Sequence, residues 1–455
     1  MSGPKVVRIV TREEIEAICR QHMAQLDEAI DALRRVAARL DRLDADLETE
    51  LARQRQILAS QFAAERWAEL QKRAPELIAG LQTHKDRIRE AAAGAAAEAR
   101  TRSRRFAEGA RALVRALEAQ GLAVDQDLRQ ATASAFGASA EKLAVLEAAM
   151  NGALGQLRAA ASPLSPASGQ RELAQRLAAG AEQRSLASWL ATAAPADPCD
   201  ARLDALLADI ETRGGAKALQ RFADRAASIA AEADFTRRAV LTDSLCLDAG
   251  RWVADQRAHE AVADRLRGAR ATLGLLASAD AQALSKQVAG ALYSADFQHA
   301  EKLCAAAEEI AEREAKSEAA SARRRAVLSG LATLGYEVRE SMATAWAQDG
   351  RLFLRKPASA DYGVELGASA NLDRLQIRVV GADQPSQPRT TERDRDQEVI
   401  WCGEFNRLRA NLAARGSDLI IERALGVGAQ PVKSVAIPSS ASTPAEASVP
   451  ISRRR

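Results

Sequence analysis

Long stretches without proline constrain this chain more than any other feature of its sequence. Proline is absent between Pro4 and Pro75, between Pro75 and Pro163, and again from 199 to 356. Because proline costs about 3 kcal/mol inside a helix, these stretches permit unusually long helices. Hydrophobic residues make up 47% of the chain but aromatic residues only 4%, a balance typical of helices packed side by side.

The first of these stretches carries a seven-residue repeat of apolar side chains. Leucines recur every seven residues and further apolar residues follow three positions later, as in a coiled coil. This leucine repeat consists of Leu26, Leu33, Val36, Leu40, Leu43 and Leu47. A helix unbroken to Arg73 would extend roughly 90 Å at 1.5 Å per residue, so we expect it to pair with another helix of this chain or of a second copy.

Two local signals mark where these helices begin. Residues 11–14, Thr-Arg-Glu-Glu, form a capping box in which the threonine hydroxyl accepts an early backbone amide. Pro75 suits the start of a second long helix that reaches Gln120, because the first turn of a helix does not need its amide.

The period of the pattern changes near residue 330. Four segments then alternate apolar and polar residues between turn-forming residues: 336–340, 351–355, 362–366 and 375–380. This alternation predicts an antiparallel meander of short strands. One helix should cover a face of that sheet through an apolar stripe of Trp401, Phe405, Leu408 and Leu412.

We therefore predict a mainly α-helical chain with a coiled-coil or helical-bundle body and a small C-terminal α+β domain, in which a meander packs against one helix. The expected boundaries are a short N-terminal strand or arm at 1–12, coiled-coil helices at 13–160, a linker at 161–170, a helical bundle at 171–328, the α+β domain at 329–425 and a disordered tail at 426–455.

Cysteine usage and hydropathy indicate the compartment. The five cysteines are scattered and form no CxxC motif, which favours a reducing environment. The charged first ten residues do not resemble a signal peptide, and no long uncharged apolar run predicts a membrane span. We expect a cytoplasmic protein without membrane contact, and the Ala- and Arg-rich composition suggests a bacterial source.

Motifs of catalysis are missing from the sequence. It contains no Walker-type phosphate loop, no dinucleotide-binding glycine fingerprint and no nucleophile elbow. His259 and Glu260 begin a zinc-protease motif, but the second histidine is missing, since Asp264 stands there. The four histidines are far apart, whereas a metal site needs converging ligands. We expect no enzyme activity, no cofactor and no metal.

Two groups of residues are candidates for contact with partners. Aromatic side chains are rare but gather in the C-terminal domain, where the candidate partner-binding residues are Trp346, Arg355, Tyr362 and Glu365. Two arginine runs could contact phosphate, although acidic neighbours dilute both: Arg102, Arg104, Arg105, Arg323, Arg324 and Arg325.

These features favour a non-enzymatic coiled-coil scaffold or adaptor subunit of a bacterial multiprotein assembly. Its C-terminal domain would dock a partner protein, such as an ATPase or a nuclease, and its N-terminal helices would form a homo-oligomer. The alternative is a nucleic-acid-associated structural protein that uses arginine-rich helix faces, for example in a defence or segregation system. The near balance of 64 basic and 61 acidic residues disfavours this alternative.

Overall fold

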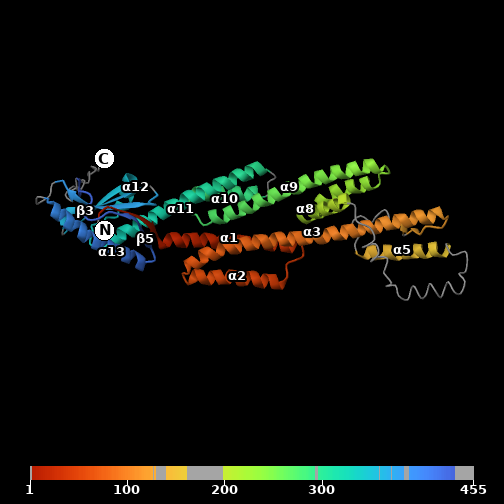
Figure 1. The fold of residues 1–455 in the computed structure, drawn as a ribbon, viewed down its shortest axis with the longest axis horizontal. Helices are drawn as coiled ribbons and strands as arrows, with labels where there is room; N and C mark the ends of the chain where they lie inside the picture. The colour runs from red at the N-terminus through yellow and green to blue at the C-terminus, as the bar shows by residue number, and fades with distance from the viewer. Residues whose placement is uncertain are drawn as a thin grey trace, which may run out of the picture.

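The computed structural model shows an elongated molecule with a small sheet domain at one end and long helices extending from it (Figure 1). We call the sheet with its packed helices the head, and the remaining helices the rod. The structure describes residues 3–126, 128–129, 140–160, 198–292, 296–357, 359–369, 371–383 and 389–435. The prediction of a mainly helical chain with an antiparallel sheet near the C-terminus is confirmed.

The first layer of the rod contains α1 (Arg12–Arg39), α2 (Ala45–Ala63) and α3 (Trp67–Ala119). Thr11 caps α1 as the capping box predicts, since its side chain accepts the amide of Glu14 at 3.3 Å. The three helices share one apolar core, which includes Leu26, Ile30, Leu33, Leu51, Leu58, Leu70, Ala74 and Leu81. The leucine repeat therefore packs against helices of the same chain, and regular coiled-coil geometry stays a prediction.

The prediction of a single helix that reaches Arg73 is wrong, because the chain turns between α1 and α2. Asp41 takes a left-handed conformation with φ of 52°, and Asp44 caps α2 by accepting the amide of Leu47 at 2.8 Å. A short polar side chain tolerates the left-handed region and offers the backbone an alternative to the helix. The repeat is thereby cut: Leu40 ends α1, and Leu43 lies in the turn with 36% of its surface exposed.

The prediction that Pro75 begins a helix is also wrong. It lies inside α3, which starts at Trp67 and runs for 53 residues, or about 80 Å. Near the far end of α3, α5 (Ala140–Ala160) packs against it through a core that includes Phe106, Leu117, Leu146 and Met150.

The second layer of the rod contains four helices: α8 (Pro198–Ala230), α9 (Phe235–Leu273), α10 (Ala279–Ala291) and α11 (Phe297–Thr333). One core joins α8 to α9, and another joins α9, α10 and α11. The last turns of α11 enter the head, where Val327 and Leu331 are buried. The predicted linker at 161–170 lies outside the described residues.

The head contains a sheet whose strand order is β2-β3-β4-β1-β5, with β6 pairing in parallel with β4. These strands are β1 (Lys5–Val10), β2 (Arg351–Lys356), β3 (Ser359–Ala368), β4 (Leu375–Ala382), β5 (Asp418–Ala424) and β6 (Lys433–Val435). The helices α12 (Met342–Asp349) and α13 (Thr391–Ala414) complete the head. Three predicted strands are present, but the segment at 336–340 is not a strand, and α12 follows it.

The N-terminal strand is an integral part of the head and not a separate arm. β1 lies between β4 and β5 and is antiparallel to both, with Val6 opposite Gln376 and Ile9 opposite Leu419. This arrangement gives two interlocked split β-α-β units, with β4 between β1 and β3, and β1 between β4 and β5. The whole rod is therefore an insertion into the first crossover of a small domain.

The boundary predicted for a disordered tail at residue 426 is wrong for its first ten residues. Residues 426–435 are described and include β6. The amide of Gly428 donates to the carboxylate of Glu398 at 2.6 Å, which fixes this segment against α13. Residues 436–455 lie outside the described part of the chain.

Leu33→Ala should lower the free energy of unfolding by about 2–5 kcal/mol, because Leu33 is fully buried between helices of one chain. Leu43→Ala, the matched change in the exposed turn, should cost less than about 0.5 kcal/mol. Urea denaturation followed by circular dichroism at two protein concentrations measures both changes. A Leu33→Ala effect that grows on dilution would instead place this residue in an interface between copies.

Candidate functional site

Three of the four predicted partner-binding residues are buried inside the head. Trp346 is 1% exposed and Tyr362 5%, and both belong to the apolar core under the sheet. Glu365 is 3% exposed and bonds to Arg378. Arg355 is half-buried and donates to Glu337 at 3.2 Å. Trp346 and Tyr362 are therefore not exposed, because strand alternation turns Tyr362 toward the helices and α12 carries Trp346 into the core. Arg355 and Glu365 lie on the other face of the sheet, and their role in binding a partner stays a prediction.

Two polar clusters anchor helix α13 to the sheet. The hydroxyl of Tyr362 donates to Asp394 at 2.7 Å, and Arg389 donates to the same carboxylate at 2.9 Å. Burial raises the pKa of Tyr362, and the hydrogen bond to Asp394 adds to this rise. These groups have complementary partners on neighbouring elements, which is the pattern of structural anchors.

The second cluster lies deeper in the head. The hydroxyl of Tyr336 donates to Glu404 at 2.6 Å, and Lys356 pairs with the same carboxylate while lying 4.8 Å from the centre of the Tyr336 ring. Burial and then the bond to Glu404 raise the pKa of Tyr336, so the phenol stays protonated at neutral pH. The ring of Trp401 meets Tyr336 edge-on at 6.1 Å.

Lys5 is a buried cation in β1, an inner strand of the head sheet. It is 2% exposed, and its ammonium has no hydrogen-bond partner among the described residues. The ammonium lies 4.9 Å from the centre of the Phe405 ring. Burial lowers the pKa of Lys5, while the nearby Cys402 and Glu398 oppose that shift.

The largest polar arrangement joins the two layers of the rod. Four cations on one stripe of α3 face carboxylates on α8 and α9, and we call this set the ion-pair seam. Its cations are Lys85, Arg89, Arg100 and Arg104. Its carboxylates are Asp200, Asp204, Glu211, Glu260 and Asp264. The seam lies between separate apolar cores, so charges help to connect the layers here.

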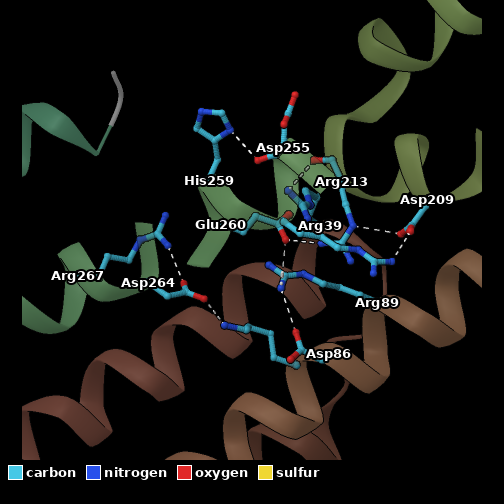
Figure 2. Close-up of polar contacts among 12 residues, drawn as sticks. Arg39, Asp86, Arg89, Asp209, Arg213, Asp255, His259, Glu260, Asp264 and Arg267 are labelled. Carbon is cyan, nitrogen blue, oxygen red and sulfur yellow. Dashed lines mark hydrogen bonds and ion pairs between the residues drawn. The ribbon is translucent and has the colours of Figure 1, made fainter. Parts of the chain in front are cut away.

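Figure 2 shows the half of this seam nearer the head. Lys85 pairs with Asp264. Glu260 forms ion pairs with Arg89, at 3.5 Å, and with Arg213. Arg39 lies beside them, and burial together with the positive charge of Arg89 lowers its pKa. A cavity of about 690 Å³ opens here between α1, α3 and α9, and its lining mixes cations and carboxylates, as an ion-pair network does.

The other half of the seam contains Arg104, one of the arginines predicted to contact nucleic acid. Arg104 donates to Asp204 at 2.6 Å and to Asp200 at 2.8 Å, and Asp204 is only 1% exposed. Arg104 is therefore paired within the chain and is not available to a phosphate. Arg102, two residues earlier on α3, does lie exposed, and Arg105 is half-buried. The spacing of four between Lys85 and Arg89, and between Arg100 and Arg104, is the sequence signal that could have identified this stripe.

The second arginine run lies where the rod meets the head. Arg323 is buried and donates to Glu14 on α1 at 2.6 Å and to Asp373 before β4 at 2.9 Å. It therefore ties the first and last rod helices to the sheet and is not available to phosphate. Arg324 is half-buried, and Arg325 is exposed and donates to Ser321 at 3.0 Å.

The face of the sheet away from the helices is a further candidate, and of its residues the sequence analysis named only Arg355 and Glu365. Helices cover the face that carries Val7, Ile9 and Leu366, whereas Arg8, Arg351 and Gln376 point to the opposite side and are exposed. A hollow of about 940 Å³ lies on that open side. Strand alternation could have identified Arg351, but only the pairing of β1 with β4 places Arg8 at the rim of the same hollow.

The described residues contain no group of three or more His, Cys, Asp and Glu side chains arranged to hold a metal ion. No helix in the described part of the chain combines the length and apolarity needed to cross a membrane. Burial raises the pKa of Cys19 to about 11, and it raises those of Cys246 and Cys304 as well, which leaves these thiols protonated at neutral pH.

Arg104→Ala should destabilise the contact between α3 and α8 by about 3–5 kcal/mol, because it leaves the buried Asp204 without its guanidinium partner. Hydrogen exchange of the α8 amides measures this local opening. Arg102→Ala removes the same charge from an exposed position of the same helix, and it should change the exchange by less than about 0.5 kcal/mol. Equal effects of the two variants would contradict a structural role for the seam.

Lys5→Met should raise the free energy of unfolding at pH 7 by about 1 kcal/mol or more, since it removes a buried ammonium. Because the pKa of Lys5 is lower in the folded state than in the unfolded state, the unfolded state binds more protons between these two pKa values, and the free energy of unfolding is reduced there. The stability of the parent protein should therefore rise as pH increases from this lowered pKa toward the ordinary value of 10.5. Denaturation curves between pH 7 and 10 test this, and Lys5→Met should lack the rise.

No family model, no curated protein and no solved structure matches the chain.

Proposed function

We propose that this protein is a non-enzymatic scaffold in which a helical rod holds a partner-docking head at a fixed distance from a second site. The observation that carries the proposal is the insertion of the rod into the head. The chain leaves the sheet after β1 and returns through α11, so both ends of the rod are anchored in one small domain. Such a connection resists swivelling more than a single linker does.

The polar groups of the molecule support a structural role. The ion-pair seam joins the layers of the rod, and Arg323 joins the rod to the head. The clusters around Glu404 and Asp394 fasten α13 to the sheet. Each of these carboxylates bonds to side chains from neighbouring elements, as expected of groups that hold a shape and not of groups poised for proton transfer.

Self-association is part of the proposal, but a surface other than the N-terminal leucine repeat is better placed to provide it. Leu26 and Leu33 are fully buried within the chain. On α9, in contrast, three large apolar side chains are more than half exposed: Phe235, Val240 and Leu247. Val240 and Leu247 lie seven residues apart and hence on the same helix face, where a second copy could cover them.

The alternative of a rod that binds nucleic acid through arginine-rich helix faces has less support. Arg104 and Arg323, which belong to the two predicted runs, bond to carboxylates of the same chain. Those carboxylates already provide the negative charge that a phosphate would supply.

Small-angle scattering coupled to size-exclusion chromatography and light scattering tests the scaffold. A compact chain of this length has a radius of gyration of about 22 Å, and the rod should give a clearly larger value. Val240→Asp combined with Leu247→Asp should convert oligomers to monomers without changing the elongated shape. Val145→Asp combined with Leu154→Asp changes exposed residues of α5 and serves as the matched control. A compact radius for the monomer would refute the proposal.

A further inference from the structure

We propose that the open face of the head sheet binds single-stranded nucleic acid, with phosphates held at a cup rimmed by arginines and a base stacked on Phe353. We define the cup as the hollow of about 940 Å³ on that face. This inference goes beyond the scaffold proposed above, which requires no nucleic acid. It also involves none of the arginines in the two predicted runs as the phosphate-binding groups.

The register of the strands builds the cup. Arg351 on β2 lies opposite Gly367 on β3, Gly367 lies opposite Gln376 on β4, and Gln376 lies opposite Val6 on β1. Because Gly367 has no side chain, the row dips in the middle and its floor is backbone. A backbone floor lets an extended chain of another molecule approach the sheet closely.

Two of the four arginines that line the cup have no carboxylate partner among the described residues. Arg374 bonds to Glu422 at 2.8 Å, and Arg323 bonds to Asp373 at 2.9 Å, so the carboxylates that line the cup already have partners. Arg8 and Arg351 are exposed, and neither has an acidic partner among the described residues. Two such guanidinium groups beside one hollow match phosphate, which they can bind through paired hydrogen bonds.

Phe353 supplies a surface for a base in the next row of the same face. Its neighbours Leu352 and Leu354 point into the core, so Phe353 points to the open side, where it is partly exposed. The residue opposite it, Glu365, is buried and neutralised by Arg378, with Lys433 3.8 Å away. A stacked base would therefore meet an aromatic ring bordered by cations and not a bare carboxylate.

These features together favour a single strand over other polyanions. A duplex presents its phosphates with the bases enclosed, so it would use Arg8 and Arg351 but leave Phe353 without a partner. An acidic peptide offers carboxylates but no flat ring for Phe353. Single-stranded nucleic acid combines phosphates with accessible bases, and aromatic stacking contributes to its binding whatever the sequence.

Fluorescence anisotropy of the full chain with labelled oligo(dT) and oligo(U) 20-mers, between 50 and 300 mM salt, tests the inference. Arg8→Gln combined with Arg351→Gln should weaken binding at least tenfold at low salt. The slope of log affinity against log salt should become shallower by about 1.4, since two phosphate contacts are lost at roughly 0.7 each. Phe353→Leu should weaken binding about tenfold and leave the salt slope unchanged, because stacking releases no counterions.

The matched control is Arg42→Gln combined with Arg102→Gln, which removes two exposed arginines from the rod and should leave affinity within twofold. The inference is overturned if the unaltered protein fails to bind either oligonucleotide at 50 mM salt. It is also overturned if the control variant loses as much affinity as the Arg8 and Arg351 variant, or if polyglutamate displaces the oligonucleotide at equal charge concentration. None of these outcomes alters the radius of gyration that tests the scaffold.

Discussion

Pairing of the first strand with two strands near the C-terminus is the constraint on which the architecture depends. β1 lies between β4 and β5, so the sheet forms only when strands from the two ends of the chain meet. Everything from α1 to α11 must then leave the sheet and come back to it. The elongated rod meets this requirement, because helices that run out from the head and return to it bring their two ends together at the sheet (Figure 1).

The rod does not have one continuous hydrophobic core. Separate apolar cores hold α1 to α3, α8 with α9, and α9 with α10 and α11. Between the first two of these, α3 meets α8 and α9 through the ion-pair seam (Figure 2). Paired charges have directional geometry, and an unpaired buried charge is costly. The seam therefore fixes the register of the layers more specifically than sliding aliphatic surfaces would.

The head combines a closed side with an open one. Core residues such as Ile9, Leu366 and Trp346 hold the helices on one face. The other face carries arginines without acidic partners and the partly exposed Phe353. A scaffold whose head contacts nucleic acid while its rod positions a partner would use both properties of the molecule. The two proposals nevertheless rest on different residues and are tested separately.

The sequence by itself determined the secondary structure of most of the described chain. Stretches free of proline allowed long helices, alternation marked β2, β3 and β4, and Thr11 marked the start of α1, because these signals act between residues close in sequence. It failed at Asp41 and Asp44, where two short polar side chains outweighed the leucine repeat, and at Pro75, which α3 tolerates within its third turn.

Only the tertiary structure decided which of the candidate residues are accessible. Arg102 and Arg104 belong to one arginine run, yet Arg102 is exposed and Arg104 pairs with Asp204, because α8 packs against a single face of α3. Arg8 came to line the same hollow as Arg351 through strand pairing across nearly the whole chain. Burial and long-range pairing depend on contacts that local patterns do not encode, so the candidate surface emerged only when the chain was folded.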